Sequence, residues 1–275
     1  MTQIETGSFT SSEFTEPRSA IRVVSWNIAR GAKLNAIVDF LVSADADIIF
    51  LQETDKNARR TAYRDVAKEI AQKLGTHYVF GCEFEELAQG SPDSPAYHGQ
   101  TTLSRWPLPV CSILRFGSQS DFWRPRWFIP SLAPLQRRRG ARMALFSTVR
   151  TPGKVLVTYN IHFESRGNDN LRYSQLQEVL HDVNRYSLDV PVLAAGDFNF
   201  DLSNGQSATA LRDMQFFNPF AALRQGTTIP HSLSTRDHII DWILLRGPLI
   251  ATNPRVHTSV RASDHFPLSI TVRFL

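Results

Sequence analysis

The order of its apolar segments constrains the fold of this chain more than any other feature of the sequence. Residues 21–26 and 48–51 are short apolar runs, rich in β-branched residues, and they predict buried strands. Residues 34–43 and 58–74 carry apolar side chains at helical spacing and predict amphipathic helices. The chain therefore opens as strand, helix, strand and helix, which predicts a sheet covered by helices.

Strand-like runs dominate the rest of the chain. They are joined by turns or irregular segments, so hairpins and antiparallel pairing are expected. The predicted strands are 78–82, 101–103, 108–114, 143–150, 155–161, 190–194, 239–245, 250–256 and 268–274, with a helix over 171–186. No repeat or linker interrupts this pattern, so one α/β domain over residues 19–275, with mixed sheets and helices outside, is the economical prediction.

Composition narrows the class of protein. With 42% hydrophobic and 20% charged residues, the chain has the composition of a soluble globular protein, and a net charge of +4 does not indicate a uniformly basic surface. Residues 1–18 lack the apolar core of a secretion signal and predict a mobile lead-in, with order beginning near Pro17. No apolar run approaches a membrane span. Two cysteines, Cys82 and Cys111, are too few for a disulfide framework, so a reducing, cytoplasmic location is expected.

Polar side chains suited to catalysis or metal binding lie at the ends of the predicted strands. They are Asn27, Glu53, His162, Asp197, Asn199 and the pair Asp264 and His265. Any one of them could be a helix cap or a turn former. Because strand ends of one sheet system can converge on a single rim, the coincidence of several such residues favours a shared site.

The residue types at these positions suit one kind of chemistry. Glu53, Asp264 and the Asn27 amide offer hard oxygen ligands, which favour Mg²⁺ or Mn²⁺ over zinc. Hydrolysis of a phosphate ester requires charge neutralisation on the phosphate oxygens, an oriented water and help for the leaving oxygen. A carboxylate beside an imidazole supplies an oriented histidine, and an amide and a second histidine can donate to the phosphate.

The chain contains seven short motifs, five of which include these residues. In chain order they are Ser25-Trp26-Asn27, Leu51-Gln52-Glu53, Leu103-Ser104-Arg105-Trp106-Pro107-Leu108, Tyr159-Asn160-Ile161-His162, Gly196-Asp197-Phe198-Asn199, Ile240-Asp241-Trp242-Ile243 and Ser263-Asp264-His265. Together they resemble the endonuclease/exonuclease/phosphatase superfamily, which includes pancreatic-type deoxyribonucleases, abasic-site endonucleases, neutral sphingomyelinases and inositol polyphosphate 5-phosphatases. The resemblance spans roughly residues 21–275.

The resemblance implies both a fold and a reaction. The expected fold is a four-layer α/β sandwich, in which two mixed, mainly antiparallel sheets pack face to face with helices outside. The expected enzyme is a metal-dependent phosphodiesterase or phosphatase that uses in-line attack of water. By resemblance, Glu53 is the principal metal ligand, Asn27 lies beside it, and Asp264 completes the environment of a Mg²⁺ or Mn²⁺ ion.

The resemblance also implies catalytic roles for five side chains. Asp197 positions or deprotonates the attacking water, and Asn199 holds the phosphate. His265 lies against the scissile phosphate, with Asp241 fixing its tautomer, and His162 donates to a non-bridging oxygen or to the leaving group.

The sequence departs from the family pattern at two positions. Gln100 stands where many relatives have asparagine, so we do not include it among the catalytic residues. His162 replaces the tyrosine usual in abasic-site endonucleases, which argues against a dedicated repair enzyme. Among the histidines outside the motifs, His98 lies close to the Gln100 position.

The segment 116–142, in which arginines alternate with Trp and Phe, bears on the substrate. Such a segment can clamp a phosphodiester backbone and stack on bases, but it also fits a surface that rests on lipid headgroups, or a packed loop over a sheet edge. Arg142 and Arg166 are the candidate substrate-binding residues. Nucleic acid, DNA or RNA, ranks slightly above phospholipid or a soluble phosphate ester, and no obligate protein partner is expected. A non-catalytic binding protein of the same fold is the alternative from another class.

Overall fold

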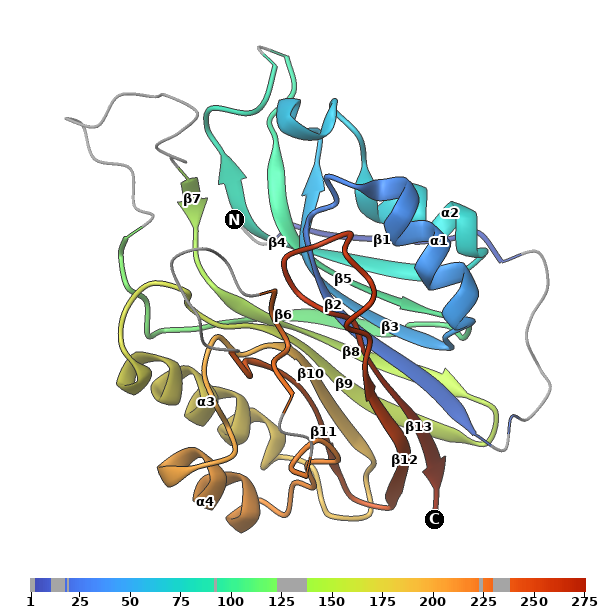
Figure 1. Cartoon of the computed structure of the whole chain (residues 1–275), viewed down its shortest axis with the longest axis vertical. Helices are drawn as coiled ribbons and strands as arrows, with labels where there is room; N and C mark the ends of the chain where they lie inside the picture. Colours follow the sequence, from blue (N-terminus) through green and yellow to red (C-terminus); the bar gives the residue numbers. More distant parts are fainter. Residues whose placement is uncertain are drawn as a thin grey trace.

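The computed structural model of this chain describes residues 3–10, 18, 20–91, 93–122, 138–222, 225–229 and 238–275. Within these ranges the strands form two sheets (Figure 1). The larger sheet has the order β1 (Ile4–Ser8), β4 (His77–Glu86), β5 (Tyr97–Ser104), β3 (Ile48–Lys56), β2 (Ile21–Arg30), β13 (Leu268–Phe274) and β12 (Leu249–Val256), with β7 (Arg138–Gly140) also paired to β4. The smaller sheet has the order β11 (Asp241–Arg246), β10 (Val192–Asp197), β9 (Lys154–His162), β8 (Met143–Thr151) and β6 (Val110–Arg115).

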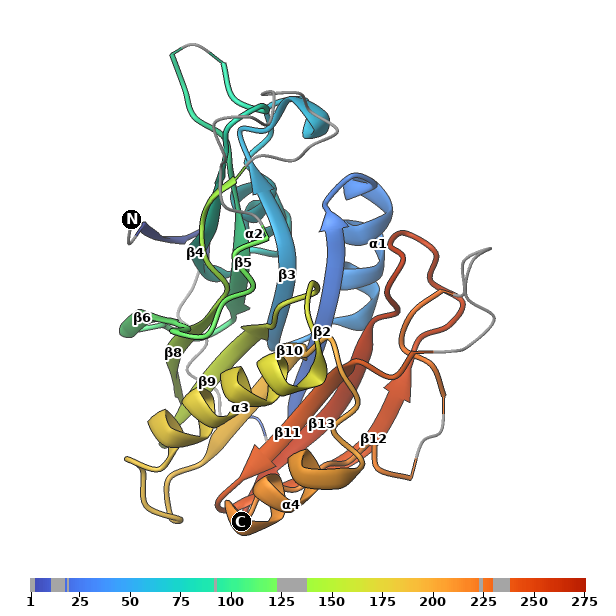
Figure 2. The same ribbon diagram turned by 90° about the vertical axis from the view of Figure 1, so that its left-hand side faces the viewer.

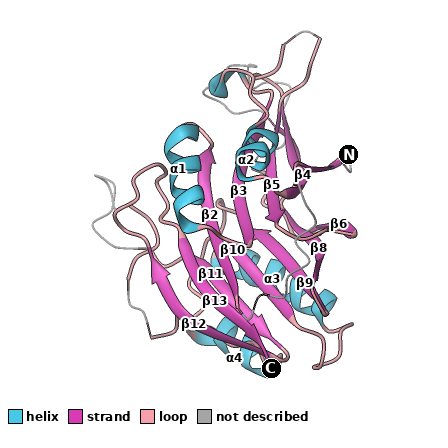
Figure 3. Ribbon diagram, turned by 90° about the vertical axis from the view of Figure 1, so that its right-hand side faces the viewer, coloured by secondary structure: helices cyan, strands magenta, loops and turns pink. Residues whose placement is uncertain are grey.

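Helices cover the outer faces of both sheets. Helices α1 (Leu34–Ala44) and α2 (Val66–Leu74) lie on the larger sheet, and α3 (Asp169–Val183) and α4 (Gly205–Asp213) lie on the smaller one (Figures 2 and 3). None of the helices in the described ranges is both long and apolar enough to cross a membrane. The predicted layering of two mixed sheets with helices outside is confirmed.

Each sheet has a parallel pair of strands at its centre. β2 runs parallel to β3 in the larger sheet, and β9 runs parallel to β10 in the smaller one, while the other pairings between described strands are antiparallel. Successive side chains of a strand point to opposite faces of its sheet. Accordingly, Ile48 and Phe50 of β3 join the core shared with the smaller sheet, whereas Ile49 and Leu51 pack under α1 and α2.

The N-terminal segment differs from the predicted mobile lead-in. Residues Ile4–Ser8 form β1, which pairs with β4 at the edge of the larger sheet. The Tyr78 hydroxyl donates a hydrogen bond of 2.8 Å to Glu5, and Glu5 also pairs with Lys56. As an edge strand, β1 is largely exposed and has few apolar residues. From the sequence alone, this polarity is typical of a disordered segment. Pro17, where we expected order to begin, lies outside the described residues.

Two helical segments also differ from the sequence prediction. The helix expected over 58–74 is divided into a short 3₁₀ helix, η1 (Arg59–Thr61), and α2, because Ala62 and Tyr63 adopt positive φ angles and Asp65 caps α2 through the backbone N–H of Lys68. Helix α4 was not predicted. Its mean hydropathy is low and few of its side chains are buried, so it lacks a clear apolar stripe.

A glycine allows close contact between β9 and β10 beside the candidate site. Gly196 has a φ of +146°, and a Cβ at this position would lie 1.9 Å from the carbonyl oxygen of Ile161. Only glycine fits this conformation and this spacing. The next residue, Asp197, is thereby held directly beside His162 of the neighbouring strand.

Candidate active site

The ends of the two parallel strand pairs bring the predicted residues together. Asp197 ends β10, where it is in register with His162 of β9 on one side and Asp241 of β11 on the other. Asn27, on β2 of the larger sheet, donates from Nδ2 to Asp197 Oδ2 at 3.1 Å. This buried hydrogen bond joins the two sheets at the site, with Asp197 at the centre.

Two imidazoles flank the Asp197 carboxylate. Nε2 of His162 and Nε2 of His265 each lie 3.8 Å from Asp197 Oδ2. These distances exceed those of hydrogen bonds, so neither imidazole is bonded directly to the carboxylate. On the other side of each ring, Nδ1 lies beside a buried acid: 2.9 Å from Asp241 Oδ2 for His265 and 3.1 Å from Glu83 Oε1 for His162. Nε2 of both rings therefore lies on the side of Asp197, and Nε2 of His162 also lies 3.0 Å from Arg142 Nη1.

The carboxylates around His265 favour its charged form. Burial alone would lower the pKa of His265, but Asp241 and Asp197 raise this pKa to about 10. At neutral pH the ring is then an imidazolium, with Nδ1–H directed at Asp241 and Nε2–H available on the side of Asp197. The expected carboxylate partner of His265 is present in the geometry that fixes the orientation of the ring.

Glu83 is the site residue that our sequence reasoning missed. It is buried on β4, and although burial would raise its pKa, His162 and Arg142 hold that pKa well below its usual range. Gln100 donates from Nε2 to Glu83 Oε1 at 2.7 Å and to the Met143 carbonyl oxygen at 2.9 Å. A signal was available, because Glu83 directly follows the predicted strand 78–82, as the other candidates follow theirs.

Arg142 occupies an internal position rather than the substrate-facing one we expected. Its side chain is buried, and Nη1 lies 2.9 Å from Glu83 Oε2 and 2.8 Å from His162 Nδ1. Its Nη2 donates to the Ser165 hydroxyl at 3.3 Å. The guanidinium therefore supports the Glu83 and His162 pair from inside the protein. Arg166, the other predicted contact, is exposed on the loop after β9.

Glu53 lies at a bulge in β3 with a strained backbone. Its φ is +54°, a left-handed conformation that is costly for a non-glycine residue and tends to occur at functional sites. Burial would raise the pKa of Glu53, but the nearby His98, His162, Arg30 and Arg142 side chains hold it well below its usual range. The nearest ion-pair partner among the described residues, Arg30 Nε, is 4.0 Å away. The carboxylate is thus ionised, surrounded by positive charge, and not tied to one partner.

The three predicted metal ligands, Glu53, Asn27 and Asp264, offer oxygen donors that suit a hard divalent cation. Asn27 Oδ1 accepts from the Ala29 backbone N–H at 3.1 Å, and Asp264 Oδ1 accepts from the Ser263 hydroxyl at 3.1 Å. Each oxygen keeps a lone pair for a ligand, and Asp264 is exposed. Oxygen ligands of this kind fit Mg²⁺ or Mn²⁺. A different group, Asp197, Asp241 and His265, has ligand atoms that all lie within 4.8 Å of one another.

Asn199 lies two residues after Asp197 and, like Glu53, has a positive φ, of +56°. Its backbone N–H donates to Asp197 Oδ1 at 2.9 Å, and its Nδ2 donates to the Phe163 carbonyl oxygen at 3.1 Å. An amide nitrogen carries two hydrogens, so one remains for the predicted contact with a phosphate.

A second buried charge network lies next to the site. His98 Nδ1 is 2.8 Å from Asp55 Oδ1, and Arg60 donates to both Asp55 oxygens at 2.6 and 2.7 Å. Arg60 also bonds Glu86 at 2.9 Å. His98, which lies outside the sequence motifs, is therefore a buried residue of this network.

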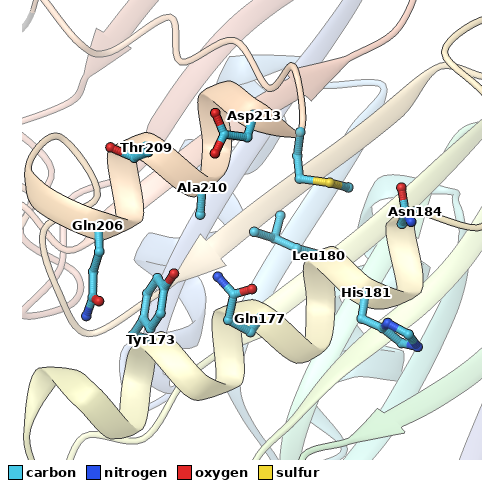
Figure 4. Close-up of a pocket in the computed structure, with 10 residues that line it drawn as sticks. Tyr173, Gln177, Leu180, His181, Asn184, Gln206, Thr209, Ala210 and Asp213 are labelled. Atoms are coloured by element: carbon cyan, nitrogen blue, oxygen red, sulfur yellow. The ribbon is translucent and has the colours of Figure 1, made fainter.

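The cavity between α3 and α4 is separate from this site. It has a volume of about 580 Å³ and is polar along much of its length (Figure 4). Its lining residues are Tyr173, Gln177, Leu180, His181, Asn184, Gln206, Thr209, Ala210, Asp213 and Met214. None of the eight residues predicted for catalysis or metal binding lines it.

The structure therefore combines two packed mixed sheets with histidines, carboxylates and amides that gather at one edge of the sheets. The model of the Endonuclease/Exonuclease/phosphatase family matches residues 24–265. The chain belongs to this family. A sequence search of curated proteins found no significant match.

Solved structures of similar fold cover nearly the whole chain. An endonuclease/exonuclease/phosphatase from Beutenbergia cavernae DSM 12333 is 17% identical, with a TM-score of 0.66, and the match covers 94% of this chain and 72% of that one. The human Nocturnin catalytic domain with bound sulfate anion is 16% identical, with a TM-score of 0.66 and coverage of 99% and 98%. A humanized D. rerio TDP2 is 18% identical, with a TM-score of 0.63 and coverage of 93% and 100%. At these identities the likeness shows the fold.

Proposed function

We propose that this chain is a divalent-metal-dependent phosphoesterase that hydrolyses a phosphodiester by in-line attack of water. Membership of the Endonuclease/Exonuclease/phosphatase family supports hydrolysis of a phosphate ester. The observation that carries the proposal is the position of Asp197 between two imidazoles, each 3.8 Å away and each backed by a buried carboxylate. This arrangement provides a proton acceptor and two oriented donors around one point, as phosphoryl transfer to water requires.

Asp197 is the residue we assign to the attacking water. Its Oδ1 is held by the backbone N–H of Asn199 and its Oδ2 by Asn27, so the carboxylate has a fixed orientation. A fixed carboxylate can orient a water and accept its proton as the oxygen approaches phosphorus. Asn199 keeps an amide hydrogen for a phosphate oxygen.

The two histidines act on the phosphate side of the reaction. His265, charged and oriented by Asp241, donates from Nε2 to a non-bridging oxygen, where negative charge increases in the transition state. His162, oriented by Glu83 and Arg142, donates to a non-bridging oxygen or to the leaving oxygen. Neither ring can turn without breaking its contact with a buried carboxylate.

The oxygen ligands of Glu53, Asn27 and Asp264 would hold the metal. The carboxylate of Glu53 would be the principal ligand because it is ionised and has no close partner among the described residues. A Mg²⁺ or Mn²⁺ ion held there would neutralise charge on the phosphate. Arg30, 4.0 Å from Glu53, adds positive charge on the same side.

Nucleic acid, DNA or RNA, is the substrate class we favour. Arg166 is exposed on the loop that follows His162, where a guanidinium can meet a phosphodiester backbone. Much of the arginine-rich segment 116–142 that suggested this substrate from the sequence lies outside the described residues. Two other expectations stay predictions: a single domain over residues 19–275, which limited proteolysis tests, and a cytoplasmic location, which cell fractionation tests.

Substitution of Asp197 tests the proposal. With Mn²⁺ and bis-p-nitrophenyl phosphate, Asp197→Asn is expected to lower kcat/KM by about 10³-fold, because it removes the proton acceptor but keeps the shape of the side chain. Asp201→Asn, a change of the same kind at an exposed residue four positions later, is the control and should change the rate less than about twofold. Equal activity of the wild type and Asp197→Asn would remove Asp197 from the reaction.

A further inference from the structure

Phe122 and Arg166 form a cation–π pair at the surface of the protein. The Arg166 guanidinium carbon lies 4.9 Å from the centroid of the Phe122 ring, and Phe122 is 55% exposed. The two side chains come from different segments: Phe122 from the chain that follows β6, and Arg166 from the loop that follows β9. A planar cation and an aromatic ring are thus brought together by the fold rather than by proximity in the sequence.

A buried carboxylate holds these two segments together. Glu164 is 1% exposed, and its Oε2 accepts from the Ser120 hydroxyl at 2.7 Å while its Oε1 accepts from the backbone N–H of Arg166 at 3.1 Å. The Ser120 hydroxyl in turn accepts from the backbone N–H of Phe122 at 3.2 Å. One buried acid therefore fixes the backbone of both segments that form the cation–π pair. A pair fixed in this way loses little conformational freedom when it binds a ligand.

The pair is connected directly to the reaction centre. Arg166 is four residues after His162, so their Cα atoms are at most about 15 Å apart. Arg142 contacts His162 and also donates to Ser165, the residue before Arg166. The loop between His162 and Arg166 is further anchored where Asn199 bonds the Phe163 carbonyl oxygen. The pair therefore belongs to a loop that is anchored to residues of the reaction centre, and the Arg166 Cα lies at most about 15 Å from that of His162.

We propose that Phe122 and Arg166 form a subsite that stacks the planar base of a nucleotide whose phosphate lies in the reaction centre. This inference rests on the proposed function and names its substrate class. Every nucleobase has a π-face, and both aromatic rings and guanidinium planes stack on it. The Arg166 charge also suits the adjacent phosphodiester.

The surface of the described residues favours a base over a lipid membrane. Membrane binding through a surface patch needs a broad apolar area supported by basic residues. Other described residues also expose large apolar side chains, for example Val42, Tyr63 and Phe217. They lie outside the two segments that form the pair. Among the described residues, the two segments place one exposed aromatic ring beside one guanidinium, which suits one planar group.

Two substrates with the same leaving group test the subsite. Thymidine 5′-(p-nitrophenyl phosphate) carries a base, whereas methyl p-nitrophenyl phosphate does not, and both release p-nitrophenol. Phe122→Ala is expected to lower kcat/KM for the thymidine ester about tenfold, within the range measured for loss of one base-stacking aromatic, and to change that for the methyl ester less than twofold. Phe122→Tyr, which keeps the ring, should retain the wild-type preference. Phe217→Ala, at a phenylalanine of similar exposure (56%) elsewhere, is the matched control.

The outcomes separate this inference from the proposed function. Suppose that the wild type hydrolyses the methyl ester with Mn²⁺, but that Phe122→Ala lowers kcat/KM for both esters equally or for neither. The proposed function is then supported and the base subsite is wrong. If Phe122→Ala instead abolishes binding to anionic phospholipid vesicles and leaves the thymidine ester unchanged, the pair is a membrane contact and the base subsite is again wrong. If the wild type hydrolyses neither ester with any divalent metal, the proposed function fails and the subsite with it.

Discussion

Replacement of His265 by alanine is expected to lower kcat/KM for bis-p-nitrophenyl phosphate by about 10³-fold or more, in the range found for loss of a charged donor or a general acid. The reason is the combination of charge and orientation at this ring. His265 is buried with Nδ1 2.9 Å from Asp241, and its Nε2 lies on the side of Asp197 where we place the phosphate. Water that fills the space left by the ring is neutral and is not held in one orientation.

The companion substitution Asp241→Asn keeps the His265 ring but changes the carboxylate that orients it, so it tests the orientation and charge of the ring apart from its presence. It keeps the size of the side chain but removes the charge that does most to raise the pKa of His265 to about 10. His265 loses its charge as the pH rises through its pKa, so activity that depends on the imidazolium is present at neutral pH and lost on the alkaline side. Asp241→Asn should therefore lower kcat and move this alkaline loss to lower pH, which a pH profile of kcat measures.

A histidine outside the site provides the control for both variants. His257 is partly buried and its Nε2 lies 2.8 Å from the Ser269 hydroxyl. His257→Ala removes the same side chain and should change kcat/KM less than about threefold, a change within the modest effect of most substitutions away from a site. If His265→Ala keeps more than a tenth of the wild-type activity while its melting temperature is unchanged, His265 does not stabilise the transition state.

Glu53→Gln is the second substitution with a large expected effect, and it acts through the metal. Glutamine keeps the length of the side chain and one carbonyl oxygen but loses the negative charge that binds a hard cation. We expect the Kd for Mn²⁺ to rise at least about 100-fold, since loss of a direct ligand should exceed the 10–100-fold effect of losing a residue that only supports one. Isothermal titration calorimetry measures this without an activity assay.

The activity of Glu53→Gln should fall because less metal is bound, and it should return in part when more metal is added. At a fixed Mn²⁺ concentration, kcat/KM of Glu53→Gln is expected to be about 10³-fold below that of the wild type. Glu69→Gln, at a partly exposed position of α2, is the matched control. Unchanged Mn²⁺ affinity in Glu53→Gln would show that the metal binds elsewhere, for example at Asp197 and His265, whose ligand atoms also lie close together.

The sequence predicted the sheets and most of the candidate site for a physical reason. Buried strands are marked by short apolar runs, and the polar residues at their ends are set apart by that contrast, as with Asn27, Glu53, His162 and Asp197. Register then brings together residues distant in the chain. Asp197 and His162 are neighbours because two parallel strands end at the same level.

The features that were missed depend on contacts between segments that are distant in the sequence. β1 is polar and is stabilised by its pairing with β4 and by the contacts of Glu5 with Tyr78 and Lys56. Glu83 gains its role only because β4 passes beside β8 and β9, where it meets Arg142 and His162. Its sequence neighbours do not indicate these partners.

Arg142 shows why charge alone is a weak guide to substrate contacts. In an arginine-rich segment it was a natural candidate for binding phosphate, yet its side chain is buried and paired with Glu83. A buried carboxylate requires a buried cation, because an unpaired charge in the interior is strongly destabilising. Exposure, which separates Arg142 from Arg166, is set by the tertiary fold.

The rate of bis-p-nitrophenyl phosphate hydrolysis by metal-free wild-type protein, before and after addition of Mg²⁺ or Mn²⁺, tests the central claim most directly. The metal is first removed with EDTA and the chelator is then dialysed away. We predict no hydrolysis above the buffer rate in the metal-free protein and saturable hydrolysis once either ion is added. Hydrolysis that is the same with and without metal, or no hydrolysis with either ion by folded protein, would contradict the account.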